Sequence, residues 1–289
     1  MGDYFIKALA CGDSLRVITT VTTETVREAQ TRHRTWPTAT AALGRTLTAT
    51  MMMAAQQKGD EKITVTIQGG GPIGAIVADA NTSGQVRGYV TNPEVHFDLN
   101  AQGKLDVARA VGNAGFLSVV KDLGLRENFT GRVPIISGEL GDDFTYYFAR
   151  SEQVPSAVGV GVLVNPDESV KAAGGFIIQV LPGADDAVIE KLENRLKEIP
   201  PISKLIDAGH SPEQLLDDLF ADHDYRVLQK HSAEFYCDCS KEKFGDSIAG
   251  LGTKEIQAMI DEDGGAEVTC QFCETHYQFT ADELKALMH

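Results

Sequence analysis

Two close pairs of cysteines near the end of the chain have the spacing of a metal site. The first pair reads C-D-C at residues 237–239, and 30 residues later the second reads C-Q-F-C at 270–273. Brought together, two pairs present four sulfur atoms in a tetrahedral set, which favours Zn²⁺ among the available metals. The fifth cysteine, Cys11, lies outside this pattern. The sequence therefore predicts one zinc ion, with the ligands Cys237, Cys239, Cys270 and Cys273.

Three kinds of site compete as explanations of these four cysteines. A disulfide scaffold needs an oxidising compartment, and the sequence shows no export signal. A catalytic zinc ion needs an open coordination position, which four thiolates close. A closed zinc site is the favoured interpretation, and it leaves open whether the metal only stabilises the fold or also acts as a switch.

A zinc ion bound by four cysteines can act as a redox switch. The metal keeps the sulfurs as thiolates, which are the form that oxidants attack. Each close pair supplies its own partner, so oxidation is expected to join Cys237 to Cys239 and Cys270 to Cys273. Disulfides ligate zinc poorly, and structural zinc contributes about 10–16 kcal/mol to small finger peptides. An acidic unit of about 60 residues that loses this metal is expected to unfold.

The first 178 residues predict a mixed α+β domain built on antiparallel sheet. β-prone runs at 4–10 and 15–22 flank a Cys-Gly-Asp-Ser turn, which is typical of a hairpin. Two helices are expected over 23–33 and 38–57, and the second should be largely buried because it is rich in Ala, Leu and Met. Short connections between the later strands favour hairpins over parallel crossovers. Those expected strands cover residues 62–68, 74–80, 85–91, 116–121, 144–149, 157–163 and 175–181.

Residues 179–227 predict an acidic helical linker. Apolar residues recur at helical spacing from Val188 to Ile199, and Pro200-Pro201 ends that helix. Ser211-Pro212-Glu213-Gln214 has the N-cap residue, the proline and the glutamine of a capping box. Helices this short need another surface to stay folded, and the first domain is the surface expected. We therefore expect a linker that can dock and undock.

Residues 228–289 predict a third unit, a small zinc-binding domain. It contains 12 acidic and five basic side chains, so nucleic acid is disfavoured as a partner, because phosphate contacts need Lys and Arg. No apolar run in the chain reaches the roughly 18 residues of a membrane helix. The N-terminus lacks the basic and apolar regions of a secretory signal. The expected location is the cytoplasm, without a membrane partner.

Motifs in all three segments resemble one known family. Residues 235–244 read FYCDCSKEKF, and the second cysteine pair at 270–273 is followed by Y-Q-F at 277–279. The stretches GGPIG at 70–74 and QVLPGA at 179–184 also match. Over essentially its full length, the chain resembles the redox-regulated heat-shock chaperones of bacteria, the thirty-three-kilodalton heat-shock protein family.

The resemblance implies an ATP-independent holdase, which is a chaperone and not an enzyme. In that family the reduced, zinc-bound form is inactive. Oxidation forms the two neighbouring disulfides, releases zinc, unfolds the C-terminal region and linker, and favours an active homodimer that holds unfolding client proteins. Carried over here, residues 1–178 would provide client binding and dimerisation. The zinc ligands and redox switch would be Cys237, Cys239, Cys270 and Cys273.

The remaining sequence offers no competing chemistry. The Gly103-Lys104 pair is followed by Leu105, so the Walker pattern for binding ATP phosphates is not met. Ser, His and Asp residues show no nucleophile-elbow pattern, so no catalytic residue is assigned. The alternative function is a zinc-module binding protein in which the metal is purely structural.

Overall fold

The polypeptide divides into two units between Tyr236 and Cys237, directly before the first of the paired cysteines. The computed structural model describes residues 2–101, 103–220, 222 and 224–288. Residues 228–236, which the sequence grouped with the cysteines, belong to the first unit here because they pair with two of its strands. The division of function among 1–178, 179–227 and 228–289 stays a prediction.

Two largely antiparallel sheets form the framework of the first unit, as the predicted α+β class requires. One sheet has the order β10-β1-β2-β9-β8, and the other has the order β11-β5-β4-β3-β6-β7, in which only β11 pairs in parallel. The strands of the first sheet are β1 (Tyr4–Ala10), β2 (Leu15–Val21), β8 (Ser156–Val164), β9 (Val170–Val180) and β10 (Tyr225–Ser232). Those of the second are β3 (Lys62–Gln68), β4 (Ala75–Asn81), β5 (Gln85–Val90), β6 (Phe116–Asp122), β7 (Phe129–Pro134) and β11 (Glu234–Phe235).

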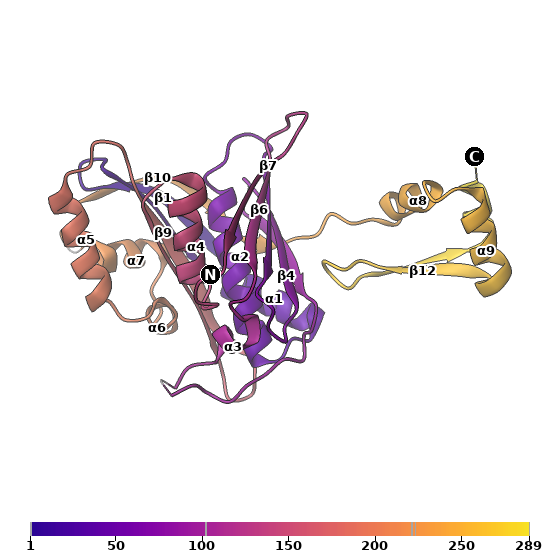
Figure 1. Cartoon of the computed structure of the whole chain (residues 1–289), viewed down its shortest axis with the longest axis horizontal. Coiled ribbons are helices and arrows are strands. Elements are labelled where there is room, and N and C mark those ends of the chain that lie inside the picture. Colours follow the sequence, from indigo (N-terminus) through magenta and orange to yellow (C-terminus); the bar gives the residue numbers. More distant parts are fainter. Residues whose placement is uncertain (1, 102, 221, 223, 289) are drawn as a thin grey trace. The chain divides into compact units, whose positions relative to one another are not determined.

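Helix α2 (Pro37–Ala54) lies between the two sheets (Figure 1). It packs on β3, β4 and β5 on one side and on β8 and β9 on the other, and every residue except Arg45 is buried. The hydroxyls of Thr46, Thr48 and Thr50 donate to the carbonyl four residues earlier, which satisfies them within an apolar layer. The predicted buried helix is confirmed. Helix α1 (Thr23–His33) precedes it and is also as predicted.

The prediction of a strand at residues 144–149 was wrong. These residues lie in α4 (Gly141–Tyr147) and a π-helical turn (Phe148–Glu152). Phe144, Tyr147 and Phe148 are the buried residues of this segment, and their spacing is that of one helix face. The short helix α3 (Val107–Val111) and strand β7 were not predicted.

The linker helices are α5 (Asp186–Glu198), α6 (Ile202–Asp207) and α7 (Pro212–Leu219), and they cover one face of the first sheet (Figure 1). Leu192, Ile206 and Leu216 belong to an apolar cluster with sheet residues such as Ile6 and Val17. Neighbouring strand residues point to opposite faces, so Phe5 and Ile18 belong instead to the cluster around α2. The prediction that the linker packs on the first domain is confirmed, as is the capping box of Ser211 and Gln214.

A polar cluster fastens α7 to two strands. Glu213 accepts hydrogen bonds from the Tyr4 hydroxyl (2.6 Å) on β1 and the Lys230 ammonium (3.0 Å) on β10. Burial by itself raises the pKa of Glu213, but the hydrogen bonds from Tyr4 and Lys230 outweigh it and lower that pKa to about 2. Tyr225 on β10 likewise donates to Asp217 (2.6 Å) on α7. Docking of the linker therefore depends on β10 as well as on the apolar cluster.

The second unit has a very small apolar core. It consists of α8 (Lys241–Ala249), α9 (Thr253–Asp263), a hairpin of β12 (Gly265–Thr269) and β13 (His276–Thr280), and α10 (Ala281–Ala286). Among the residues described, its buried apolar cluster contains only Ile248, Ile256, Phe279 and Leu284, with partly buried residues packed around them. So few buried side chains supply little hydrophobic stabilisation. No helix in the described part of the chain is long and apolar enough to cross a membrane.

We expect Glu213→Gln to loosen α7 at neutral pH, because the variant replaces the carboxylate that Tyr4 and Lys230 hold. A carboxylate with a lowered pKa stabilises the folded state above the unfolded pKa, near 4.5, and this contribution is lost as the pH falls towards 2. Amide exchange over 212–219 should therefore be faster in the variant at pH 7, and the difference from the parent should shrink at low pH. The control is Glu190→Gln, at an exposed position of α5; equal exchange in parent and Glu213→Gln at pH 7 would contradict the prediction.

Candidate metal centre

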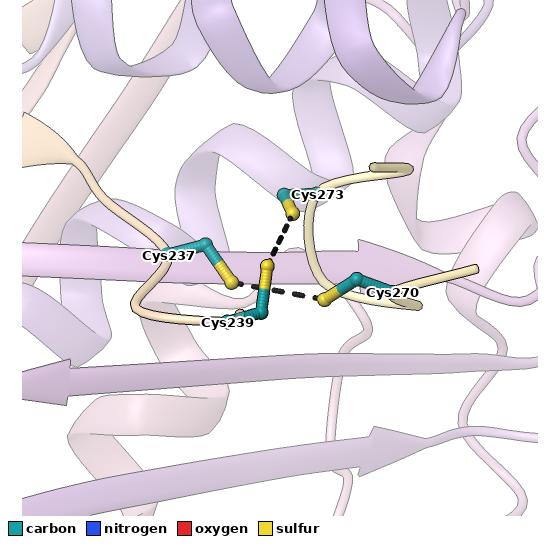
Figure 2. Close-up of side chains that lie close together, drawn as sticks. All are labelled: Cys237, Cys239, Cys270 and Cys273. Carbon is teal, nitrogen blue, oxygen red and sulfur yellow. Dashed lines mark hydrogen bonds between the residues drawn. The ribbon is translucent and has the colours of Figure 1, made fainter. Parts of the chain in front are cut away.

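The structure brings together the four cysteines that the sequence predicted as ligands. Their Sγ atoms all lie within 4.8 Å of one another, and Figure 2 shows the side chains pointing inward from two loops. The Sγ atoms of Cys239 and Cys273 are 3.3 Å apart, and those of Cys237 and Cys270 are 3.7 Å apart. Tetrahedral zinc with Zn–S bonds of about 2.3 Å needs sulfur–sulfur separations of about 3.8 Å. The set therefore fits a zinc ion.

Each cysteine pair is positioned by a local backbone motif. The first pair precedes α8, whose N-cap residue Ser240 accepts a hydrogen bond from the Lys243 amide (3.2 Å). The second pair lies in the turn between β12 and β13, where the Cys270 carbonyl accepts from the Glu274 amide (2.7 Å). Glu274 has a left-handed backbone (φ 59°), which reverses the chain directly after the second pair. Folding of the hairpin and capping of α8 thus shape the two halves of the site.

Burial affects the protonation of the thiols in this site. Cys270 and Cys273 are buried, and burial raises the pKa of the Cys270 and Cys239 thiols above the usual range. Burial also acts to raise the pKa of Cys273, but hydrogen bonding with Thr275 outweighs this and lowers it to about 7. Without a metal, burial therefore favours the neutral thiols of Cys239 and Cys270. A divalent ion is what allows all four to be present as thiolates at neutral pH.

Residues around the sulfurs complete the site, and the metal-ligand pattern alone does not reveal them. The Tyr277 hydroxyl lies 3.2 Å from Cys239 Sγ and 3.1 Å from the Cys239 carbonyl oxygen, and its ring packs on Phe244. The Lys243 ammonium donates to both the carbonyl and the carboxylate of Asp238 (2.7 Å each), between the first two ligands. The feature of the sequence that could have indicated these two residues is their closeness to the cysteines. Lys243 follows the first pair by four residues, and Tyr277 follows the second pair by four.

Cys11 is separate from this site, as the sequence predicted. It lies in the turn between β1 and β2 of the first unit and is half-buried. No disulfide joins any of the five cysteines, all of which lie in the described part of the chain. In a tetrahedral set each sulfur is near the other three, so proximity does not select a partner. Disulfide pairing within each motif therefore stays a prediction.

The two-unit α+β fold carries four clustered cysteines that could hold a metal ion, and comparison with known proteins identifies the family. The family model described as "Hsp33 protein" matches residues 3–280. The "33 kDa chaperonin" of Bacillus subtilis is 61% identical over 285 residues, covering 99% of this chain and 98% of that protein. The protein of the same name from Geobacillus kaustophilus is 60% identical over 287 residues, covering 99% and 98%.

A solved structure agrees with the sequence comparison. The crystal structure of the 33 kDa chaperonin (heat shock protein 33 homolog) from Thermotoga maritima superposes with a TM-score of 0.90. It is 37% identical in sequence, and the match covers 99% of this chain and 97% of that one. This chain belongs to the Hsp33 family.

We expect Cys239→Ser and Cys270→Ser to weaken zinc binding under reducing conditions, because each removes one of four thiolate ligands. The second unit should loosen as well, since the metal offsets its small core. Zinc content after dialysis against a chelator, with amide exchange over 237–288, measures both effects. Cys11→Ser is the matched control and should retain one zinc per chain. An unchanged zinc affinity in both ligand variants would disprove the ligand assignment.

A second variant tests the surroundings of the ligands. Tyr277→Phe removes the hydroxyl beside Cys239 and keeps the ring that packs on Phe244. Loss of a group that supports a ligand typically costs about 10–100-fold in metal affinity. We expect a decrease of this order in competition with a chromogenic chelator. Zinc affinity equal to that of the parent would show that the hydroxyl does not support Cys239.

Proposed function

We propose that this protein is an ATP-independent molecular chaperone, a holdase, that oxidation activates. In the reduced state Cys237, Cys239, Cys270 and Cys273 bind one Zn²⁺, and the chaperone is inactive. Oxidation joins Cys237 to Cys239 and Cys270 to Cys273, and the metal leaves. The observation that carries this proposal is four sulfurs within 4.8 Å in a unit with a very small apolar core. Membership of the Hsp33 family, whose relatives are named chaperonins, supports the chaperone class.

The size of the second unit makes the metal decisive for its folding. Structural zinc contributes about 10–16 kcal/mol in finger peptides, which is as large as the whole stability of many domains. Four buried side chains do not compensate for such a loss. Oxidation that expels the ion therefore unfolds residues 237–288, so that a reaction at the sulfurs changes the conformation of the whole unit.

The linker supplies the second stage of activation. Its helices depend on docking for stability, because they are short and acidic. When they leave, the sheet face formed by residues such as Ile6, Val17 and Phe176 becomes accessible. A large exposed apolar face binds unfolding client proteins and favours a homodimer. The proposed setting is the cytoplasm, with no nucleic acid, membrane or catalytic reaction involved.

A purely structural zinc ion is the alternative, and a paired titration separates the two functions. Zinc and free thiols are counted before and after oxidant, while the protein is tested for suppressing the aggregation of a thermally unfolding enzyme. We expect one zinc released, four thiols lost and suppression appearing together, and Cys11→Ser should behave like the parent. Zinc that stays bound, or leaves without any gain in suppression, would refute the redox-activated chaperone and favour the structural role.

A further inference from the structure

Residues 225–236, here called the strap, lie along the edges of both sheets. The strap comprises β10, which pairs with β1, and β11, which pairs with β5. Between the two strands the Ala233 amide donates to the carbonyl of Asp3 (3.0 Å). The amides of Glu234 and Tyr236 donate to the carbonyls of Gly84 (3.1 Å) and Val86 (3.0 Å). Without the strap, β1 and β5 would be the edge strands of their sheets.

The strap is held mainly by its backbone and buries few side chains. Ala233 is its only buried residue, and Val227 and Leu228 are 46% and 47% exposed. The backbone approaches so closely that a Cβ at Gly84 would lie 2.1 Å from the carbonyl oxygen of Ser232. Segments with few buried apolar contacts open at low free energy. The strap is thus closely fitted to the edges and buries little apolar surface, although Arg226 pairs with Asp13 and His231 stacks on Phe5.

The strap is also placed to respond when the zinc centre is lost. Its last residue, Tyr236, directly precedes the ligand Cys237. Its other end is tied to α7, because Lys230 bonds Glu213 and Tyr225 bonds Asp217. Undocking of the linker removes these side-chain partners from β10. The strap then has an unfolded segment on each side and little burial of its own to retain it.

We propose that displacement of the strap opens the edges of β1 and β5, and that these edges bind extended segments of client proteins as added strands. This inference rests on the proposed chaperone function and assigns it a binding surface. Strand addition relies on main-chain hydrogen bonds, which every polypeptide offers, so it suits a chaperone that must accept unrelated sequences. The present occupant shows the geometry, because an extended segment already fills both edges.

The environment of the strap also indicates which client segments fit best. Ala233 packs into the core around α2, where a small apolar side chain is accommodated. Phe235 lies with its ring 5.5 Å from the Arg32 guanidinium and 6.5 Å from the His33 ring. A cationic group over an aromatic face is attractive. The edges therefore favour extended segments that carry a small apolar residue and an aromatic residue two positions later.

A synthetic peptide with the strap sequence, residues 225–236, tests this inference on the full-length protein. The peptide contains no cysteine, so it adds nothing to the thiol count and cannot form a disulfide with the protein. A fluorescent form should bind the oxidised protein and not the reduced, zinc-loaded protein, and the unlabelled form should reduce suppression of client aggregation. The control peptide carries Glu234→Pro and Tyr236→Pro, which remove two main-chain donors to β5. Its affinity should be at least tenfold lower.

Amide exchange provides an independent readout of the same edges. Oxidation should speed exchange over 4–10 and 85–90, and addition of a thermally unfolding client should slow it again. If the oxidised protein suppresses aggregation but the strap peptide neither binds nor competes, the edges are not the client site and the chaperone function stands. Equal binding of the peptide to the reduced protein would also overturn the inference. If the oxidised protein suppresses nothing, the proposed function fails and the client site fails with it.

Discussion

The burial of sulfurs that must be thiolates to bind a metal is the constraint on which the second unit depends. Burial raises the pKa of the Cys239 and Cys270 thiols, which favours their neutral forms when no cation is bound. A divalent ion held by the four sulfurs would offset this effect and would join the segment before α8 to the β12–β13 turn. In the proposed function, the second unit, with its very small apolar core, then depends on metal–sulfur bonds that oxidants can remove. Few larger domains are exposed to such control, because their cores hold them together without a metal.

The first unit has two separate apolar clusters, one around α2 and one between the first sheet and the linker helices. Successive side chains along β1, β2 and β9 point to opposite faces of the sheet, so one set packs towards α2 and the other towards the linker helices. The two apolar clusters are therefore distinct, although they share strands. In the proposed activation, the inner cluster would keep its helix and both sheets when α5, α6 and α7 undock. The Tyr4–Glu213 and Tyr225–Asp217 hydrogen bonds fix the position of α7 on the first sheet.

Local signals in the sequence were enough to predict much of the fold and to single out the four cysteines that the structure brings together. The Cys-Gly-Asp-Ser turn predicted the first hairpin, and Ser211 with Gln214 predicted the start of α7. The strand predicted at residues 144–149 was wrong, and there the spacing of Phe144 and Tyr147 was the better guide. The pairing of β10 with β1 joins residues more than 200 positions apart, and the exposed side chains of β10 show no alternation that could indicate it. The contact between Tyr277 and Cys239 likewise joins residues that lie far apart along the chain.

The order of the elements along the chain has a consequence for synthesis on the ribosome. Every buried member of the cluster around α2 except Ala233 lies at or before Ile177, so this core can form before the linker helices have been made. Translation proceeds at about 5–20 residues per second, and 56 residues follow Val180, the end of β9, up to Tyr236, the end of the strap, so the sheet face stays uncovered for several seconds. Each newly made chain thus passes through a stage in which its apolar face and strand edges are uncovered. The linker and strap pack onto a core that has already folded. Until they do, the nascent chain exposes the outer face of the first sheet and the edges of β1 and β5, which are covered in the mature protein.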